Sequence, residues 1–274
     1  MLRRIKKPGK LFIGVIILLG ASIGDIVGSI HAWNNIRTKK FELFDVRCKF
    51  SGATVLTCAV AKALKKYVQS GKKIDLQAEL TEEMLNFGWL YPDINYGRNF
   101  LAWLFADEQR SYGSAGAGAA MRVSAAGWLA ASLEEAEELA KMTAEVTHDH
   151  AEGIKGAQAV AAAIFMAREK RPKEEIKNYI EEKYYKLDFA LKDIRMRYTF
   201  NPTCAGTVPP AVVAFLEAED FEDALRNAVS IGGDSATLAA VAGSIAEAYY
   251  GIPEDIKNSA LPFMDDEIKN ALAI

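Results

Sequence analysis

The sequence is poor in cysteine and histidine, and neither residue type follows a metal-finger pattern. Its three cysteines are an odd, scattered set, with no CxxC pair among them: Cys48, Cys58 and Cys204. A disulfide framework would need paired cysteines, and a zinc finger would need closely spaced ones. We therefore expect reduced thiols and a cytoplasmic protein.

The sequence also lacks an excess of one charge and any sustained strand pattern. Its formal net charge of -3 gives no electrostatic basis for a nucleic-acid partner. No segment alternates polar and apolar residues between hairpin signals. Apolar residues recur instead at helical spacing, and helix-capping residues at Ser51, Ser132 and Asp220 predict three helix starts. We predict an all-α protein with one domain, residues 19–274, whose length allows a sizeable core.

The apolar run near the N-terminus, Leu11 to Ala21, is too short to span a bilayer comfortably. Several lysines and arginines precede it, as in a signal peptide. The run leads without a break into Ser22–Ser29, where glycines at four-residue spacing allow close approach of another backbone. We expect a buried first helix behind a basic and apolar extension, residues 1–18, and no membrane; secretion or a membrane tether is the alternative.

Two segments lead into apolar helices: one begins with two glycines and the other with a serine. Residues 231–239 read IGGDSATLA, in which two glycines precede Asp234. Backbone N–H groups at such a helix start suit a phosphate, a metal-bound water or a simple cap. The segment from Ser51 opens a helix that is apolar on most sides and is therefore expected at the centre of the fold. Residues 201–210 read as a turn that starts another helix, with Pro209 and Pro210 placed for its first turn.

Two further segments have the composition of ligand-binding loops. Residues 111–123 alternate glycine with other small residues, as in backbone nests that hold phosphate, although a flexible loop entering a packing helix is an equal alternative. His148 and His150 stand two residues apart before an alanine-rich helix. That spacing suits a metal, a phosphate or ribose contact, or neutral capping and core histidines.

Taken together, these segments resemble the ADP-ribosylglycohydrolase family. Six motifs follow the family order from about residue 20: GASIGDIVGS, TVLT, GAGAAMRV, HDHAEGIKGAQA, CAGTVP and GGDSATLA. The resemblance implies a roughly orthogonal all-α helical domain with a cleft for two magnesium or manganese ions. It also implies hydrolysis of the bond between ADP-ribose and an acceptor such as a protein side chain, with the ions holding the ribose hydroxyls and water.

The sequence departs from the family mainly at polar, ligand-facing positions. The family's first metal motif, Thr-Asp-Asp-Thr, is Ser51-Gly52-Ala53-Thr54 here. The second keeps Asp234 and Thr237 but has Ala236 in place of an acid, and the family's acid after the GDxxGS motif is Ala32. Small residues also replace polar or rigid ones in the substrate loops: Ala117 for asparagine, Ala205 for glutamine and Ala151 for proline.

These departures leave few ligands for a divalent ion. The residual oxygen ligands are Asp234 and three hydroxyls, while the vacated positions are Gly52, Ala53 and Ala236; the hydroxyls belong to Ser51, Thr54 and Thr237. Magnesium and manganese favour carboxylates, and a hydroxyl cannot act as a general base near neutral pH. We therefore expect no intact catalytic residue, ions bound weakly or not at all, and impaired or absent hydrolysis.

Contacts for ADP-ribose, or for an ADP-ribosylated acceptor, remain in the family motifs. The residues expected to make them are Asp25, Ser114, Gly116, Ala117, Gly118, His148, His150, Gly153, Gly232 and Gly233. The leading hypothesis is a catalytically impaired family member that still binds ADP-ribose. One alternative is a weak hydrolase that uses a single ion. Another is a natural or engineered non-catalytic scaffold, with a cleft lined by Ala32, Ala53, Ala117, Ala205 and Ala236.

Overall fold

The computed structural model describes residues 18–274, and this part of the chain is all-α as predicted. An isolated β-bridge joins Gly116 and Thr203. The helices are α1 (Gly20–Ser29), α2 (Gly52–Gln69), α3 (Leu76–Leu90), α4 (Arg98–Leu104), α5 (Gly118–Met121), α6 (Ser124–Leu129), α7 (Leu133–Glu145), α8 (Ala151–Arg168), α9 (Lys173–Lys183), α10 (Leu191–Ile194), α11 (Cys204–Leu216), α12 (Phe221–Ser230), α13 (Ser235–Tyr250), α14 (Glu254–Ala260), the 3₁₀ helix η1 (Leu261–Phe263) and α15 (Asp266–Ala271). Most of the expected N-terminal extension lies outside the described residues, but Leu18 is buried in the core.

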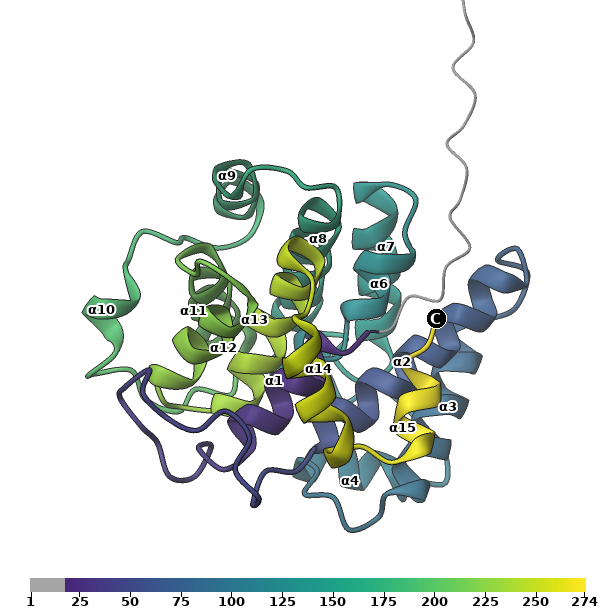
Figure 1. The fold of residues 1–274 in the computed structure, drawn as a ribbon. Helices are drawn as coiled ribbons and strands as arrows, with labels where there is room; N and C mark the ends of the chain where they lie inside the picture. The colour runs from purple at the N-terminus through teal and green to yellow at the C-terminus, as the bar shows by residue number, and fades with distance from the viewer. Residues whose placement is uncertain (1–17) are drawn as a thin grey trace, which may run out of the picture.

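The helix pair α1 and α13 forms the centre of the fold (Figure 1). Along α1, Gly20, Gly24 and Gly28 face the α13 backbone, where a Cβ atom on any of the three would overlap a main-chain carbonyl group. This confirms that the glycine spacing serves a close approach of two helices. The pairing places the C-terminal end of α1 beside the N-terminal end of α13, where Asp234 lies.

The predicted helix starts are confirmed by their caps. The Ser51 hydroxyl accepts a hydrogen bond from Ala53 N at the start of α2, and Ser132 accepts one from Glu135 N at the start of α7. Asp220 accepts one from Asp223 N at the start of α12. Each cap supplies an acceptor to an N–H group that has no partner within its own helix.

The prediction for the two prolines of α11 was wrong, because both lie in its second turn. A proline lacks the N–H that would bond to the carbonyl four residues earlier. For Pro210 that carbonyl belongs to Gly206, and it accepts a hydrogen bond from Tyr198 Oη at 3.0 Å instead. The Tyr198 hydroxyl therefore takes the place of the N–H donor that Pro210 lacks.

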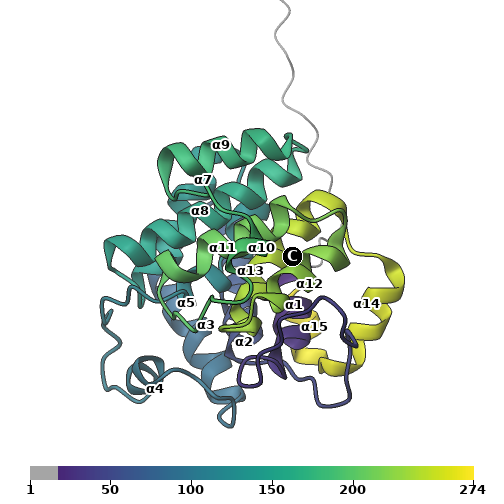
Figure 2. The same cartoon turned by 90° about the vertical axis from the view of Figure 1, so that its left-hand side faces the viewer.

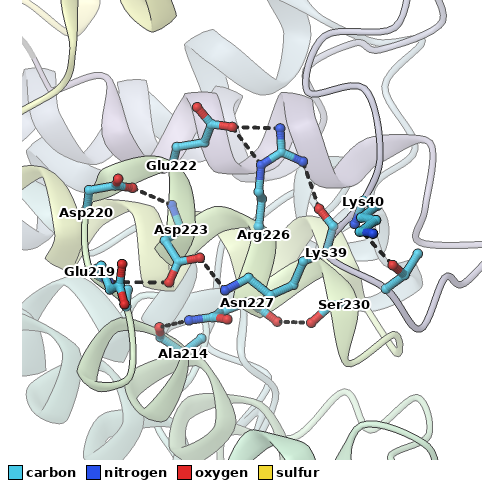
Figure 3. Close-up of polar contacts among 12 residues, drawn as sticks. Lys39, Lys40, Ala214, Glu219, Asp220, Glu222, Asp223, Arg226, Asn227 and Ser230 are labelled. Atoms are coloured by element: carbon cyan, nitrogen blue, oxygen red, sulfur yellow. Dashed lines mark hydrogen bonds and ion pairs between the residues drawn. The ribbon is translucent and has the colours of Figure 1, made fainter.

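A long connection spans residues 31–50, and an ion pair and hydrogen bonds fasten it to α12 (Figure 3). Lys39 forms an ion pair with Asp223, and Arg226 donates to the carbonyl oxygens of Lys39 and Phe41 at 2.9 and 2.8 Å. Further along, Asn35 exchanges two hydrogen bonds with the main chain of Gly233. The connection is therefore held against the loop that precedes α13.

The remaining helices enclose this centre. Figures 1 and 2 place α9 at one end of the molecule, above α7 and α8, and α4 at the opposite end. The two ends of the described chain meet, since Leu18 N donates to Leu272 O at 2.9 Å. Each helix within residues 18–274 is too short or too polar to cross a bilayer.

Candidate ligand-binding cleft

A cavity of about 620 Å³ opens where the N-terminal ends of α2 and α13 meet the small-residue loop before α5. Its volume is within the range of small-molecule sites. The cavity brings together many of the positions predicted from the sequence: Ala32, Ser51, Gly52, Ala53, Ser114, Gly116, Ala117, Gly118, His148, Asp234, Ala236 and Thr237. Segments far apart in the sequence therefore build one wall.

Other predicted positions do not line the cavity. His150 is exposed, and its Nδ1 accepts from Glu152 N at the start of α8. Gly232 and Gly233 adopt positive φ angles of 72° and 70° and lie against the side chains of Arg37 and Tyr198. Gly153 lies beneath the Ser114 carbonyl. Ala205, expected in the apolar cleft of a scaffold, is exposed at the start of α11 and does not line the cavity. The other positions away from the wall are Asp25 and Thr54.

Asp25 is fully buried and caps α2 from its position on α1. Its carboxylate accepts from Ser51 N and Oγ at 2.8 and 2.6 Å, and from Thr54 N and Oγ1 at 3.1 and 2.6 Å. Burial raises the pKa of this carboxyl, while the four hydrogen bonds oppose the shift. The expected substrate contact is thus a support beneath the cavity wall, and the Thr54 hydroxyl is directed to Asp25.

Asp234 is the one carboxylate on the cavity wall, and it caps α13. Its side chain accepts from Thr237 N at 3.2 Å and from Thr237 Oγ1 at 2.8 Å. Its neighbour Ala236 and the α2 residue Ala53 present methyl groups to the cavity. In residues 18–274, no group of three or more histidines, cysteines or acids is arranged so that it could hold a metal ion. This donor set does not fit two hard dications, which need several carboxylate or carbonyl oxygens.

His148 is buried at the wall. Its Nδ1 lies 2.7 Å from Thr147 Oγ1, and its Nε2 faces Gly118, where a Cβ atom would be only 2.8 Å away. Burial, and then the charge of Arg122, lower the pKa of His148 to about 3. The imidazole is therefore neutral near pH 7, suited to hydrogen bonding rather than to proton transfer.

The structure adds wall residues that the sequence analysis did not identify. Aromatic side chains of Trp33 and Phe200 remain 85% and 54% exposed at the cavity, and further rings come from Tyr96, Phe100 and Tyr112. The cations Lys49, Arg98 and Arg122 also line it. Two features of the sequence could have pointed to these residues: the Met-Arg-Val sequence after the glycines and the aromatic residues from position 96 onward. Neither feature indicates which way the side chains face.

The fold and the cavity thus define an all-α domain with a candidate ligand-binding cleft at the N-terminal ends of α2 and α13. The family model for ADP-ribosylglycohydrolase matches residues 14–272, so the chain belongs to this family. The family is known for metal-dependent hydrolysis of ADP-ribosylated substrates.

Similar proteins agree with this assignment. An uncharacterized protein of Archaeoglobus fulgidus is 32% identical over 154 residues, which are 50% of this chain and 50% of that protein. Human ADP-ribosylhydrolase ARH3 is 23% identical over 205 residues, 57% of this chain and 56% of the relative. The matches thus cover about half the length of each relative. A solved ADP-ribosylglycohydrolase-related protein complex shares the fold, with a TM-score of 0.65, 21% identity and coverage of 93% and 96% of the two chains.

Proposed function

We propose that this family member binds ADP-ribose, or an ADP-ribosylated acceptor, without performing two-metal hydrolysis. The observation that carries the proposal is the state of Asp234, the single wall carboxylate, whose oxygens already accept from Thr237 N and Oγ1. Its place at the start of α13 further disfavours a cation, because a helix N-terminus carries partial positive charge. Ala53 and Ala236 offer no ligand atoms.

Several features of the cavity support retained binding. It remains open, at about 620 Å³, and it is not filled by the side chains around it. Aromatic rings at its wall, including Trp33 and Tyr112, offer faces on which a base can stack. The neutral His148 and the backbone around Gly116 and Gly118 supply uncharged hydrogen-bonding groups for ribose and phosphate oxygens.

Calorimetry with ADP-ribose tests the proposal. We expect micromolar binding that EDTA does not change, and no release of ADP-ribose from an ADP-ribosylated peptide. Ala32→Phe places a large side chain in the cavity and should weaken binding at least tenfold. Ala205→Phe is the matched control, since Ala205 is exposed and lies outside the wall, and should leave the affinity unchanged.

Two results would contradict the proposal. Absence of binding at millimolar ADP-ribose would favour a scaffold without this ligand. Release of ADP-ribose that Asp234→Ala abolishes would favour a one-ion hydrolase.

A further inference from the structure

Arg122, directly after α5, is a buried cation without a carboxylate partner. Its side chain is among the largest that are fully buried, and the residue is 1% exposed. Nη2 donates to Thr143 O at 3.1 Å and to Thr147 Oγ1 at 2.7 Å, whereas Nε has no acceptor. No ion pair of the described chain includes Arg122. Buried charges are normally paired, so a unit charge held only by neutral groups needs an explanation.

A purely structural role accounts for part of this arrangement. Thr143 lies in the last turn of α7, and a cation there interacts favourably with the partial negative charge of the helix end. That role uses Nη2 alone. It explains neither the unpaired Nε nor the position of Arg122 on the wall of the cavity. Burial lowers the pKa of Arg122 to about 10, so the guanidinium still carries its charge at neutral pH.

Two further cations lie on the wall. Lys49 and Arg98 line the cavity, are exposed at its mouth, and belong to none of the ion pairs formed within residues 18–274. With Arg122 they give three cations against one carboxylate, Asp234, and the wall thus has a net charge of about +2 with His148 neutral. A cleft that held two dications would need the opposite balance.

We propose that Arg122 is the fixed counter-ion of a metal-independent anion subsite, which takes the phosphate groups of the ligand. The guanidinium is an effective partner for phosphate because its donors are rigidly placed and it is weakly hydrated. An anion bound in the cavity supplies the negatively charged partner that Arg122 lacks within the protein. The inference rests on the proposed function for the identity of the whole ligand, a nucleoside diphosphate sugar, but the subsite itself can be tested with a simple anion.

The probe is pyrophosphate, added to the full chain in a low-salt chloride buffer with EDTA. We expect it to bind by calorimetry, to raise the Tm and to compete with ADP-ribose. Arg122→Met should weaken pyrophosphate binding at least tenfold. Arg168→Met is the matched control, because Arg168 also donates to carbonyl oxygens, those of Trp128 and Ala130, but lies away from the cleft; its pyrophosphate affinity should stay within twofold of wild type.

The variant Lys49→Met/Arg98→Met alters only exposed residues and keeps the test decisive even where Arg122→Met does not fold. We expect a loss of about threefold or less; complete loss would assign the anion to the mouth of the cavity and overturn the role of Arg122. Pyrophosphate that fails to bind while ADP-ribose binds would overturn the inference and leave the proposed function intact. Pyrophosphate binding without ADP-ribose binding would overturn the proposed function and leave the anion subsite intact.

Discussion

Gly24 of α1 lies so close to the main chain of Ala239 in α13 that a Cβ atom on Gly24 would overlap the Ala239 carbonyl group and lie 2.7 Å from Ala240 N. The contact sets the spacing of the two central helices. That spacing in turn fixes the distance between Ala32, beyond the end of α1, and Asp234 at the start of α13, which both line the cavity.

Gly24→Ala should therefore destabilise the fold by about 3 kcal/mol or more, since the main chain of α13 must move to admit the methyl group. Urea unfolding measures the change. Gly97→Ala is the matched control: nothing lies within 4 Å of its added Cβ, and the expected change is within about 0.5 kcal/mol. Equal stability of the two variants would show that the α1–α13 contact relaxes freely.

Asp25→Asn should cost about 3 kcal/mol of unfolding free energy, because the amide nitrogen cannot accept hydrogen bonds and buried donors of Ser51 and Thr54 lose their partner. Asp75→Ala, which removes an exposed cap of α3, should cost only about 1 kcal/mol. Thermal and urea unfolding distinguish the two. A variant of Asp25 with wild-type stability but lost ADP-ribose affinity would instead show that Asp25 contacts the ligand.

Glu247 on α13 is buried and accepts from Leu19 N and Gly20 N, both at 3.0 Å. Burial raises the pKa of its carboxyl from 4.5 to about 7. The folded state therefore binds a proton that the unfolded state releases, and the stability from this group is lost as the pH rises through 7. Between pH 6.5 and 8 we expect the contribution of this group alone to fall by about 1 kcal/mol.

The depressed pKa values of His148 and His31 act with the opposite sign and still contribute above pH 6.5, since at that pH about half of each imidazole is protonated in the unfolded chain, so the Glu247 contribution is the difference between wild type and Glu247→Gln. Urea unfolding at the two pH values, for wild type and Glu247→Gln, gives the difference. Glu247→Gln should have lower stability overall, from the lost acceptor, and a flatter pH profile. An identical profile in both proteins would contradict the assignment.

Added magnesium or manganese should leave the Tm of the wild-type protein unchanged, because Asp234 is the single wall carboxylate. The double variant Ala53→Asp/Ala236→Asp should behave differently. Without metal, its crowded acids should lower the Tm; with millimolar magnesium, binding should restore about 1–3 kcal/mol. Ala205→Asp, outside the cavity, is the control. A clear magnesium-dependent rise in the wild-type Tm would contradict the loss of the metal site.

The fold was largely predictable because its main signals are local. The caps at Ser51, Ser132 and Asp220 mark helix starts within a few residues of sequence, and the glycine repeat in α1 predicts a close helix contact whatever the partner is. Pro209 and Pro210 were misplaced because the donor that satisfies the Gly206 carbonyl, left without its helical partner by Pro210, is the Tyr198 hydroxyl, outside the helix.

The sequence motifs predicted which segments form the cleft, but not which side chains face the cavity. Asp25 meets Ser51 only through the packing of α1 on α2, so its hydrogen bonds to the start of α2 have no local signal in the sequence. The Arg122 side chain is directed toward α7, where it donates to the Thr143 carbonyl. The exposure of Trp33 and Phe200 depends on how their two loops lie on the rest of the fold. Side-chain direction in loops is a tertiary property.

The hydrogen bond from Leu18 N to Leu272 O, at 2.9 Å, brings the two ends of the described chain together. In a variant that begins at Leu18, a short linker would join the two ends without displacing a helix, which makes circular permutation feasible. New ends would be tolerated in the exposed segment at Asp107 and Glu108, between α4 and α5. In such a permuted chain the glycine loop would come first and α4 last, with the same cavity between them.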